Sequence, residues 1–399
     1  MKIISGGVTI PRGFFAAGIS CGLKKKKIPD LALVYSGTPA VAAGVFTTNR
    51  VKAAPVLVSQ EHLRADFARA VVINSGNANA CLGEQGLKDA ALVASRTAEI
   101  LKIAPQEVLL GSTGVIGAPL PVGRILNGLP ALVKGLDPSG GRAAAEAVMT
   151  TDTFPKEWGA GLELDGGEVR VGGMAKGSGM IEPNMATMLA VLTTDARVEK
   201  ALLQRALQEV TAVTFNRITV DGDTSTNDTV YLLANGAADA PPVTGGSAYD
   251  DFLSALHEVC LRLAQMIVKD GEGATKFITV RVKRAATEKE AEIAARAAAN
   301  SNLVKTAFFG EDANWGRILA AVGYSGIDFS PDTTEISLGG LVVFRNGKGL
   351  DFDEEQAGRI LKKQELEVEI SLNRGKAEAV VWTCDLSYEY VKINASYRS

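Results

Sequence analysis

The chain alternates between segments with the residue pattern of β-strands and segments with the pattern of α-helices. Residues 70–74 form a short apolar, β-branched run, and residues 85–103 follow it with helical spacing of their apolar side chains. The clearest helix pattern covers 252–267, where the apolar residues fall on one face of a 3.6-residue repeat. Further helices are expected over about 198–213 and about 288–307, and strands over 341–344, 366–370 and 377–382. This alternation predicts an α/β or α+β fold.

The size and charge of the chain limit its domain organisation and its partners. The chain has 399 residues, 46% of them hydrophobic, which is enough for two lobes or one large layered domain. Its 42 Lys and Arg residues against 45 Asp and Glu residues leave a net charge of −3. The basic residues form no stripe, so nucleic acid is not an expected partner, and Lys24 to Lys27 are expected to form a solvated turn. Because no apolar segment reaches the length of a bilayer span, no membrane association is expected.

Cysteine and histidine usage argues against several kinds of site. The four cysteines show no CxxC pair, so neither a disulfide scaffold nor a metal site is expected; they are Cys21, Cys81, Cys260 and Cys384. Reduced thiols and the lack of a recognisable export signal predict a cytoplasmic protein. With only His62 and His257 in the chain, a Ser-His-Asp or Cys-His system has almost no base available. We expect both histidines to be structural or exposed.

Glycine is concentrated in four polar segments, which cover residues 74–79, 111–117, 172–179 and 270–276. Loops of this kind bring backbone N–H groups close to an anion, although each one taken alone is an ordinary turn. None matches a phosphate-binding loop, because Lys176 precedes Gly177 and Ser178 instead of following the glycine. An NTPase or a dinucleotide-binding enzyme is therefore only an alternative interpretation.

The segment from Lys176 to Ala190 differs from the other glycine-rich segments, because it leads through Pro183 directly to Thr187 and an apolar, strand-like run. Thr187 is therefore expected at a junction between a loop and a strand. By residue type alone it is a buried β-branched side chain. The alternative is a nucleophile, since a threonine at a new chain terminus carries its own base: an α-amine titrates near ~8 and can be neutral at physiological pH.

Five segments together resemble the glutamate N-acetyltransferase (ornithine acetyltransferase) family of arginine biosynthesis. They are 74–81, 176–190, 215–228, 310–317 and 393–399, and the likeness extends over essentially the whole chain. The resemblance implies a four-layer α/β/β/α fold and a precursor that cuts itself between Ala186 and Thr187. The products would be a first chain, 1–186, and a second chain, 187–399, assembled as a heterotetramer of two first and two second chains.

The same resemblance implies roles for individual residues. Thr187 would be the nucleophile, and the Thr113 side chain with the Gly114 backbone N–H would form the oxyanion hole. The implied substrate contacts are Thr153, Lys176, Thr187, Glu272, Asn394 and Ser399. Lys176 suits a carboxylate or an oxyanion, and Glu272 suits the ammonium of a substrate. Glu182 departs from the family pattern, where a smaller or neutral residue is expected.

The implied reaction moves the acetyl group of N2-acetylornithine to glutamate through an acetyl ester on Thr187. No cofactor is expected, and whether acetyl-CoA is also a donor stays open. Three other classes remain as alternatives: an N-terminal-nucleophile hydrolase or aminopeptidase of related fold, a glycine-rich NTPase, and an amino-acid sensor without catalysis. The last six residues, 394–399, would ordinarily be a frayed end after a terminal strand, but the resemblance places them at the active site.

Overall fold

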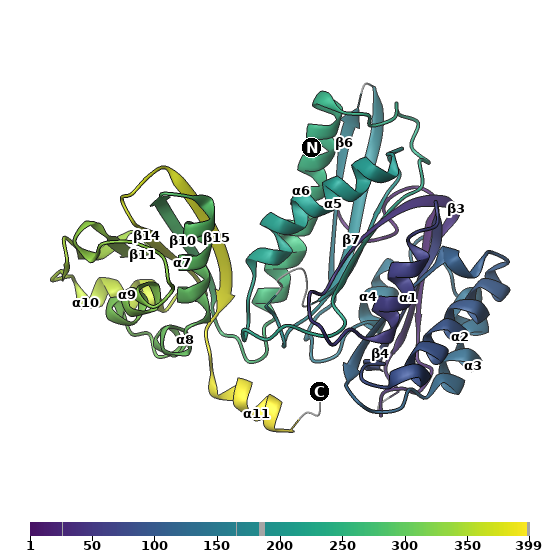
Figure 1. Cartoon of the computed structure of the whole chain (residues 1–399), viewed down its shortest axis with the longest axis horizontal. Helices are drawn as coiled ribbons and strands as arrows, with labels where there is room; N and C mark the ends of the chain where they lie inside the picture. Colours follow the sequence, from purple (N-terminus) through teal and green to yellow (C-terminus); the bar gives the residue numbers. More distant parts are fainter. Residues whose placement is uncertain (26, 165, 183–187, 397–399) are drawn as a thin grey trace. The chain divides into compact units, whose positions relative to one another are not determined.

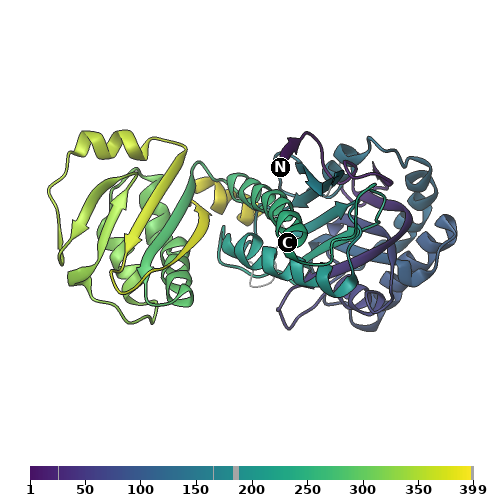
Figure 2. The same ribbon diagram turned by 90° about the horizontal axis from the view of Figure 1, so that it is seen from above.

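The structure is a computed structural model that describes residues 1–25, 27–164, 166–182 and 188–396 (Figure 1, Figure 2). The chain forms two compact units. The first unit comprises Met1–Asn216 with Asp223–Ile267, and the second comprises Arg217–Gly222 with Val268–Arg398. The expectation of two lobes is therefore confirmed, and each unit is described by itself.

The first unit is built on a sheet in which the described residues form nine strands. Their order is β1 (Lys2–Ile4), β6 (Lys156–Leu164), β7 (Gly167–Lys176), β8 (Leu189–Thr194), β9 (Thr229–Ala234), β3 (Leu31–Phe46), β4 (Ala68–Asn77) and β5 (Val108–Val115), with β2 (Phe14–Ile19) beside β3. Strand β3 is long enough to pair with three other strands. Its first part pairs with β2 and β4, and its second part pairs with β9. The sheet therefore consists of two halves joined through β3.

The two halves pack face to face. On β3, Ala32 and Val34 belong to an apolar core that also contains Val191 of β8 and Tyr231 of β9. Their neighbours Leu31 and Leu33 point the other way, because successive side chains of a strand alternate between its faces. These leucines belong to a second core with α2 (Gly83–Leu101) and α3 (Val122–Lys134). One helix layer therefore covers the outer face of the β2–β3–β4–β5 half.

A second helix layer covers the other half. Gln204 of α5 (Lys200–Val213) hydrogen-bonds both the backbone N–H and the carbonyl of Gly44 on β3, at 3.2 and 3.1 Å. A Cβ atom on Gly173 of β7 would lie 3.0 Å from Val259 and 2.8 Å from Leu263, both on α6 (Gly246–Lys269). The order of layers is thus helix, sheet, sheet, helix. The four-layer α/β/β/α fold implied by the resemblance is confirmed within this unit.

The second unit contains a six-stranded sheet among the described residues. The strands run in the order β13 (Lys348–Gly349), β12 (Leu341–Arg345), β11 (Glu335–Leu338), β14 (Glu365–Ser371), β10 (Phe277–Ala285) and β15 (Ala377–Cys384). One face carries an apolar core with helices α7 (Glu288–Asn300), α8 (Asn302–Phe309), α9 (Trp315–Gly323) and α10 (Glu354–Leu361). The other face carries cross-strand ion pairs between β10 and β14, such as Lys283 with Glu369 at 2.5 Å. Helix α11 (Tyr388–Ser396) follows β15.

Most of the expected elements are confirmed, and one is wrong. The expected helix over 288–307 is two helices, because Ser301 has an extended backbone and its hydroxyl accepts the Val304 N–H as the cap of α8. After β15 the chain is helical through Ser396. No helix among the described residues is long and apolar enough to cross a membrane.

The predicted cut between Ala186 and Thr187 lies outside the described residues. Strand β7, before it, and strand β8, after it, belong to the same compact unit and pair with each other. The predicted division into residues 1–186 and 187–399 is therefore a division of the covalent chain and not of the two units.

Candidate active site

The predicted oxyanion-hole residues lie on β5, so residues 111–114 are part of a strand and not the loop that their glycines suggested. Thr113 lies four residues after Leu109, a member of the core between the sheet halves, and alternation places both on that face. Gly114 has a φ of +129°. A Cβ atom there would lie 2.4 Å from the carbonyl carbon of Gly76 on β4, so only glycine permits this close approach.

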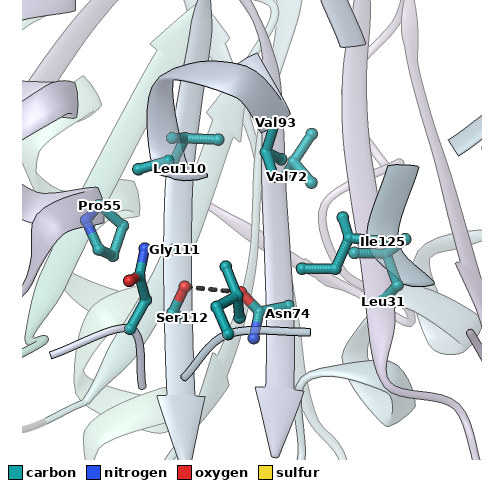
Figure 3. A pocket seen from close by; sticks show the side chains of 12 residues that line it. Leu31, Pro55, Val72, Asn74, Val93, Leu110, Gly111, Ser112 and Ile125 are labelled. Atoms are coloured by element: carbon teal, nitrogen blue, oxygen red, sulfur yellow. Dashed lines mark hydrogen bonds between the residues drawn. The ribbon is translucent and has the colours of Figure 1, made fainter. Parts of the chain in front are cut away.

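Side-chain amides fix the ends of β4 and β5 against the start of β9. The Ser112 hydroxyl donates to Asn74 Oδ1 at 2.6 Å, and the Asn74 amide donates to the carbonyl of Asn77 at 2.9 Å (Figure 3). The Asn227 amide donates to the carbonyls of Ser112 and Ala78, at 2.9 and 2.6 Å. These bonds connect both halves of the sheet at one edge, next to Thr113.

The pocket in Figure 3 is lined mainly by apolar side chains, among them Leu31, Val72 and Ile125. These three residues belong to the core between the sheet and helices α2 and α3. Thr113 and Lys176 are not among its lining residues. The pocket is therefore a packing gap behind the site and not a candidate for substrate binding.

Lys176 is the last residue of β7 and pairs in register with Leu189, the first residue of β8. It is only 7% exposed, and its ammonium donates to the Thr150 hydroxyl at 2.8 Å. Its Nζ also lies 3.7 Å from Asp152 Oδ2. The structure thus places a buried cation beside the first residue of the strand that follows Thr187.

Asp152 is the anion that balances this charge. Its Oδ1 atom lies 2.7 Å from Lys156 Nζ and accepts the Gly177 N–H at 2.7 Å. Burial by itself raises the pKa of Asp152, but the attraction of Lys176 and Lys156 outweighs it and holds that pKa well below 3.8. The carboxylate is therefore charged at neutral pH and fixes both lysines. Sequence reasoning missed Asp152, because nothing in the local pattern indicates that it is buried between two cations.

The predicted substrate contact Thr153 is exposed next to this cluster. Two residues before it contact the site: Thr150 accepts from Lys176, and the Thr151 hydroxyl lies 2.7 Å from the Ser178 hydroxyl. The role of Thr153 stays a prediction.

The expectation of a solvated turn is wrong for Lys24. Its ammonium donates to the carbonyls of Met149 and Pro29, at 2.7 and 2.9 Å. Burial and the positive charge of Lys176 lower its pKa, against the attraction of Asp30 and Asp152, to about 8. A third cation, which is half-buried, therefore lies beside the segment that carries Thr150. The run of four lysines hid it, because sequence alone does not show which lysine of a run folds inward.

Two further predicted residues meet in the second unit. Glu272 lies in the turn after α6, and Asn394 lies in the last turns of α11. The Asn394 amide donates to Glu272 Oε2 at 2.8 Å, although the two are 122 positions apart. The Ser387 hydroxyl donates to the carbonyl of Gly273 at 2.6 Å and holds the turn against the start of α11. Thr187 and Ser399, the other predicted contacts, lie outside the described residues.

Neither histidine is part of these clusters. His62 Nδ1 lies 2.7 Å from the carbonyl of Val108, and burial lowers the pKa of His257 on α6. Burial raises the pKa of the Cys260 and Cys384 thiols, which keeps them protonated. These two thiols are therefore poor candidates for a nucleophile.

The model of the ArgJ family matches residues 15–399 of the chain. The chain belongs to the ArgJ family. Two relatives with the name arginine biosynthesis bifunctional protein ArgJ are similar over their whole length. The protein of Symbiobacterium thermophilum is 54% identical, and that of Caldanaerobacter subterraneus is 51% identical; each alignment covers 100% of both chains.

Two solved structures are similar as well. A crystal structure of arginine biosynthesis bifunctional protein argJ from Bacillus halodurans is 45% identical, with a TM-score of 0.52. The match covers 53% of this chain and 100% of that one. A structure of ornithine acetyltransferase complexed with ornithine from Mycobacterium tuberculosis is 42% identical, with a TM-score of 0.44, and covers 47% of this chain and 98% of that one. Membership of the ArgJ family argues against the NTPase and sensor interpretations.

Proposed function

We propose that the chain is a glutamate N-acetyltransferase that transfers the acetyl group of N2-acetylornithine to glutamate. One observation carries the proposal: Lys176 and the Thr113–Gly114 pair lie at the edge of the sheet where β8, the strand after Thr187, begins. A nucleophile at Thr187, just before β8, would therefore lie between the proposed oxyanion hole and a buried cation. The names of the two relatives place those proteins in arginine biosynthesis.

In the proposed reaction, the α-amine of Thr187 takes the proton of its own hydroxyl, and the oxygen attacks the acetyl carbonyl. The Thr113 hydroxyl and the Gly114 N–H donate to the oxyanion, and each such donor contributes roughly 3 kcal/mol to barrier lowering. Ornithine leaves with the proton, and an acetyl ester remains on Thr187. The amine of glutamate then attacks this ester and leaves as N-acetylglutamate. The chain has two histidines, neither in the site, so a base carried by the nucleophile itself fits the residues present.

The charged groups suit the substrates. N2-acetylornithine has an α-carboxylate and a distal ammonium, and glutamate has two carboxylates. Lys176 is the proposed carboxylate contact, and Glu272 with Asn394 is the proposed contact for the ammonium. Thr153 and Ser399 complete the proposed set.

The proposed function includes a cut of the chain before Thr187. The second product would have 399 − 186 = 213 residues, which is about 53% of the chain. The Bacillus halodurans structure is matched over its full length and covers 53% of this chain, the share expected of one such product. This agreement supports the cut. We further propose that two pairs of products assemble as a heterotetramer in the cytoplasm.

A second donor is favoured by one finding. The curated relatives carry the word bifunctional in their names, and we propose that acetyl-CoA also acetylates glutamate here. Incubation of the protein with acetyl-CoA and glutamate, without N2-acetylornithine, tests this donor. Formation of N-acetylglutamate is expected. If none forms, acetyl-CoA is not a donor, and N2-acetylornithine is left as the proposed donor.

Mass analysis of the denatured protein tests the nucleophile. We expect two products of 186 and 213 residues, the second beginning at Thr187, and an intact, inactive chain for Thr187→Ala. Thr187→Ser is the matched control, since it keeps the hydroxyl and is expected to cut and to retain part of the activity. A product that begins at any other residue would contradict the assignment of Thr187.

A further inference from the structure

Lys24 is a cation at the candidate site that the proposed mechanism does not use. The stem of its side chain lies against β4, since a Cβ atom on Gly76 would lie 3.2 Å from Lys24 Cγ. Gly76 pairs in register with Gly114, whose backbone N–H is the proposed donor of the oxyanion hole. Lys24 therefore packs against the backbone that lies directly beside the proposed oxyanion hole.

The ammonium at the other end of this side chain reaches the cluster that contains Lys176. It donates to the carbonyl of Met149 at 2.7 Å. The next residue, Thr150, accepts from the Lys176 ammonium at 2.8 Å. Both lysines belong to the same compact unit. Two ammonium groups are therefore held by consecutive residues of one segment, next to the same sheet edge.

The two cations differ in their pairing. Lys176 lies near the carboxylate of Asp152, whereas Lys24 donates to two carbonyls and forms no ion pair with any carboxylate among the described residues. Asp30, on the same turn as Lys24, accepts three backbone N–H groups instead. An ammonium has three N–H donors, and buried charges in proteins are ordinarily paired. Lys24 therefore has one donor and one positive charge left for an anion.

The proposed substrates identify this anion. N2-acetylornithine and glutamate share an α-carboxylate, for which Lys176 is the proposed contact. Their side chains differ in charge, because ornithine ends in an ammonium and glutamate in a carboxylate. Glu272, the proposed contact for the ammonium, would repel a carboxylate. The acceptor therefore needs a cation that the donor does not need.

We propose that Lys24 binds the side-chain carboxylate of the acceptor glutamate and makes the enzyme selective for an acidic acceptor. This inference rests on the proposed function, which makes glutamate the acceptor. A charge-assisted hydrogen bond from an ammonium to a carboxylate is among the stronger polar contacts in proteins. Glutamine, which has the same shape without the charge, would lose this contact.

The charge of Lys24 depends on pH in a useful range. Burial lowers the pKa of Lys24, Asp30 and Asp152 raise it, and Lys176 lowers it, which leaves it at about 8. Gly76, on the strand against which the stem packs, contributes no charge. Lys24 is therefore charged below this pH and neutral above it. The proposed contact is present at neutral pH and is lost as pH rises through 8.

The test compares glutamate with glutamine as acceptor, with N2-acetylornithine as donor. Lys24→Met keeps a stem against Gly76 and removes the charge. It should lower kcat/KM for glutamate roughly 10- to 100-fold, while kcat/KM for glutamine and the release of ornithine in the first half-reaction change little. A purely structural role would slow both acceptors and the donor alike. Lys24→Arg keeps the charge and should keep the preference for glutamate.

The same run of lysines supplies the matched control. Lys27 is exposed, so Lys27→Met makes the same chemical change on the surface. It should leave the preference for glutamate over glutamine at the wild-type value. A Lys27→Met enzyme that loses this preference would contradict the assignment to Lys24.

Each outcome separates the two proposals. A wild-type enzyme that transfers no acetyl group to glutamate overturns the proposed function and this inference with it. A wild-type enzyme that does so, with Lys24→Met keeping the preference for glutamate, overturns the inference alone.

Melting curves identify a Lys24→Met variant that fails to fold, and the wild-type pH series then decides. The ratio of kcat/KM for glutamate to that for glutamine should fall as pH rises from about 7 to about 9.5, because kcat/KM follows the protonation of the free enzyme. Both acceptors have an α-amine that must lose its proton, so that requirement cancels in the ratio. A constant ratio, or no product from glutamine at the highest pH, overturns the inference.

Discussion

At the scale of single residues, the site depends on charges that burial holds in place. Asp152 binds two lysines and the Gly177 N–H, so the cluster that contains Lys176 is rigid before any substrate arrives. A preorganised charge is effective in catalysis because no reorganisation is needed when the transition state forms. Thr113 is also held in place before substrate binds, in its case by the backbone pairing of β5 with β4.

The first prediction concerns Thr113. If its hydroxyl donates to the oxyanion, Thr113→Ala should lower kcat by roughly 10²-fold with little change in KM, because the bond forms in the transition state. Thr113→Ser keeps the hydroxyl and should retain most of the activity. Steady-state kinetics with N2-acetylornithine and glutamate measure both. An alanine variant with unchanged turnover would mean that Thr113 has only a structural role.

The second prediction concerns the stability that Asp152 contributes. Because its pKa in the folded chain lies below 3.8, the charged carboxylate stabilises the fold above that pH, and this contribution is lost as pH falls through the folded-state pKa. Asp152→Asn leaves Lys156 buried without its anion and should cost about 3–5 kcal/mol at neutral pH. Denaturant unfolding at a series of pH values measures this. The difference between wild type and variant should shrink in acid, and a constant difference would contradict the assigned pKa.

The sequence indicated Thr113, Gly114 and Lys176 through their motifs, and the structure brings these residues to one edge of a sheet. The motifs gave no indication of Lys24 or Asp152 as part of the site. Burial distinguishes these two from other charged residues, and burial results from contacts between segments that are far apart in the chain. A local pattern carries no information about such contacts.

At the scale of elements, periodicity predicted helices well and glycine predicted loops poorly. The apolar side chains of α6 repeat along one helical face, and this local pattern alone was sufficient to predict the helix. The glycine-rich residues 111–114 are instead strand, because glycine at 114 allows β4 and β5 to approach closely. Glycine marks both turns and close backbone contacts, and only the structure separates the two cases.

The third prediction concerns helix α11 as a unit. Asn394 donates to Glu272 near the end of this helix, so deletion of residues 394–399 removes one partner of a proposed substrate contact. We expect KM for N2-acetylornithine or glutamate to rise at least tenfold, while melting temperature and self-cleavage change little, because the cut acts on a tethered bond. Asn394→Ala in the full-length chain should reproduce part of the increase. Unchanged kinetics in the truncated chain would exclude a role for the tail.

At the scale of the whole molecule, the two predicted products are interleaved in one sheet. Strands β3 and β7 precede the predicted cut, while β8 and β9 follow it, and the pairs β7–β8 and β3–β9 join the products. The core between the sheet halves also draws side chains from both products. The sequence could not predict this order, because strand pairing between distant segments is determined by tertiary contacts and not by local pattern.

The fourth prediction follows from this interleaving. The two products should remain together after the cut and elute as one species in size-exclusion chromatography under native conditions, because separating them requires breaking two strand ladders and a shared core. Concentrated guanidinium chloride should separate them. Two native peaks, each with one product, would contradict the pairing of β7 with β8.

The interleaving of β8 and β9 among earlier strands also constrains when the proposed cut could occur. A ribosome that has completed only the first 186 residues has not yet made the strands that lie between β7 and β3, so the architecture around the cut does not exist at that stage. The bond at the proposed cut would become reactive only after the later strands have been inserted. A divided chain would then be a permanent record that the sheet was completed, and undivided chain in a cell extract would report molecules in which it was not.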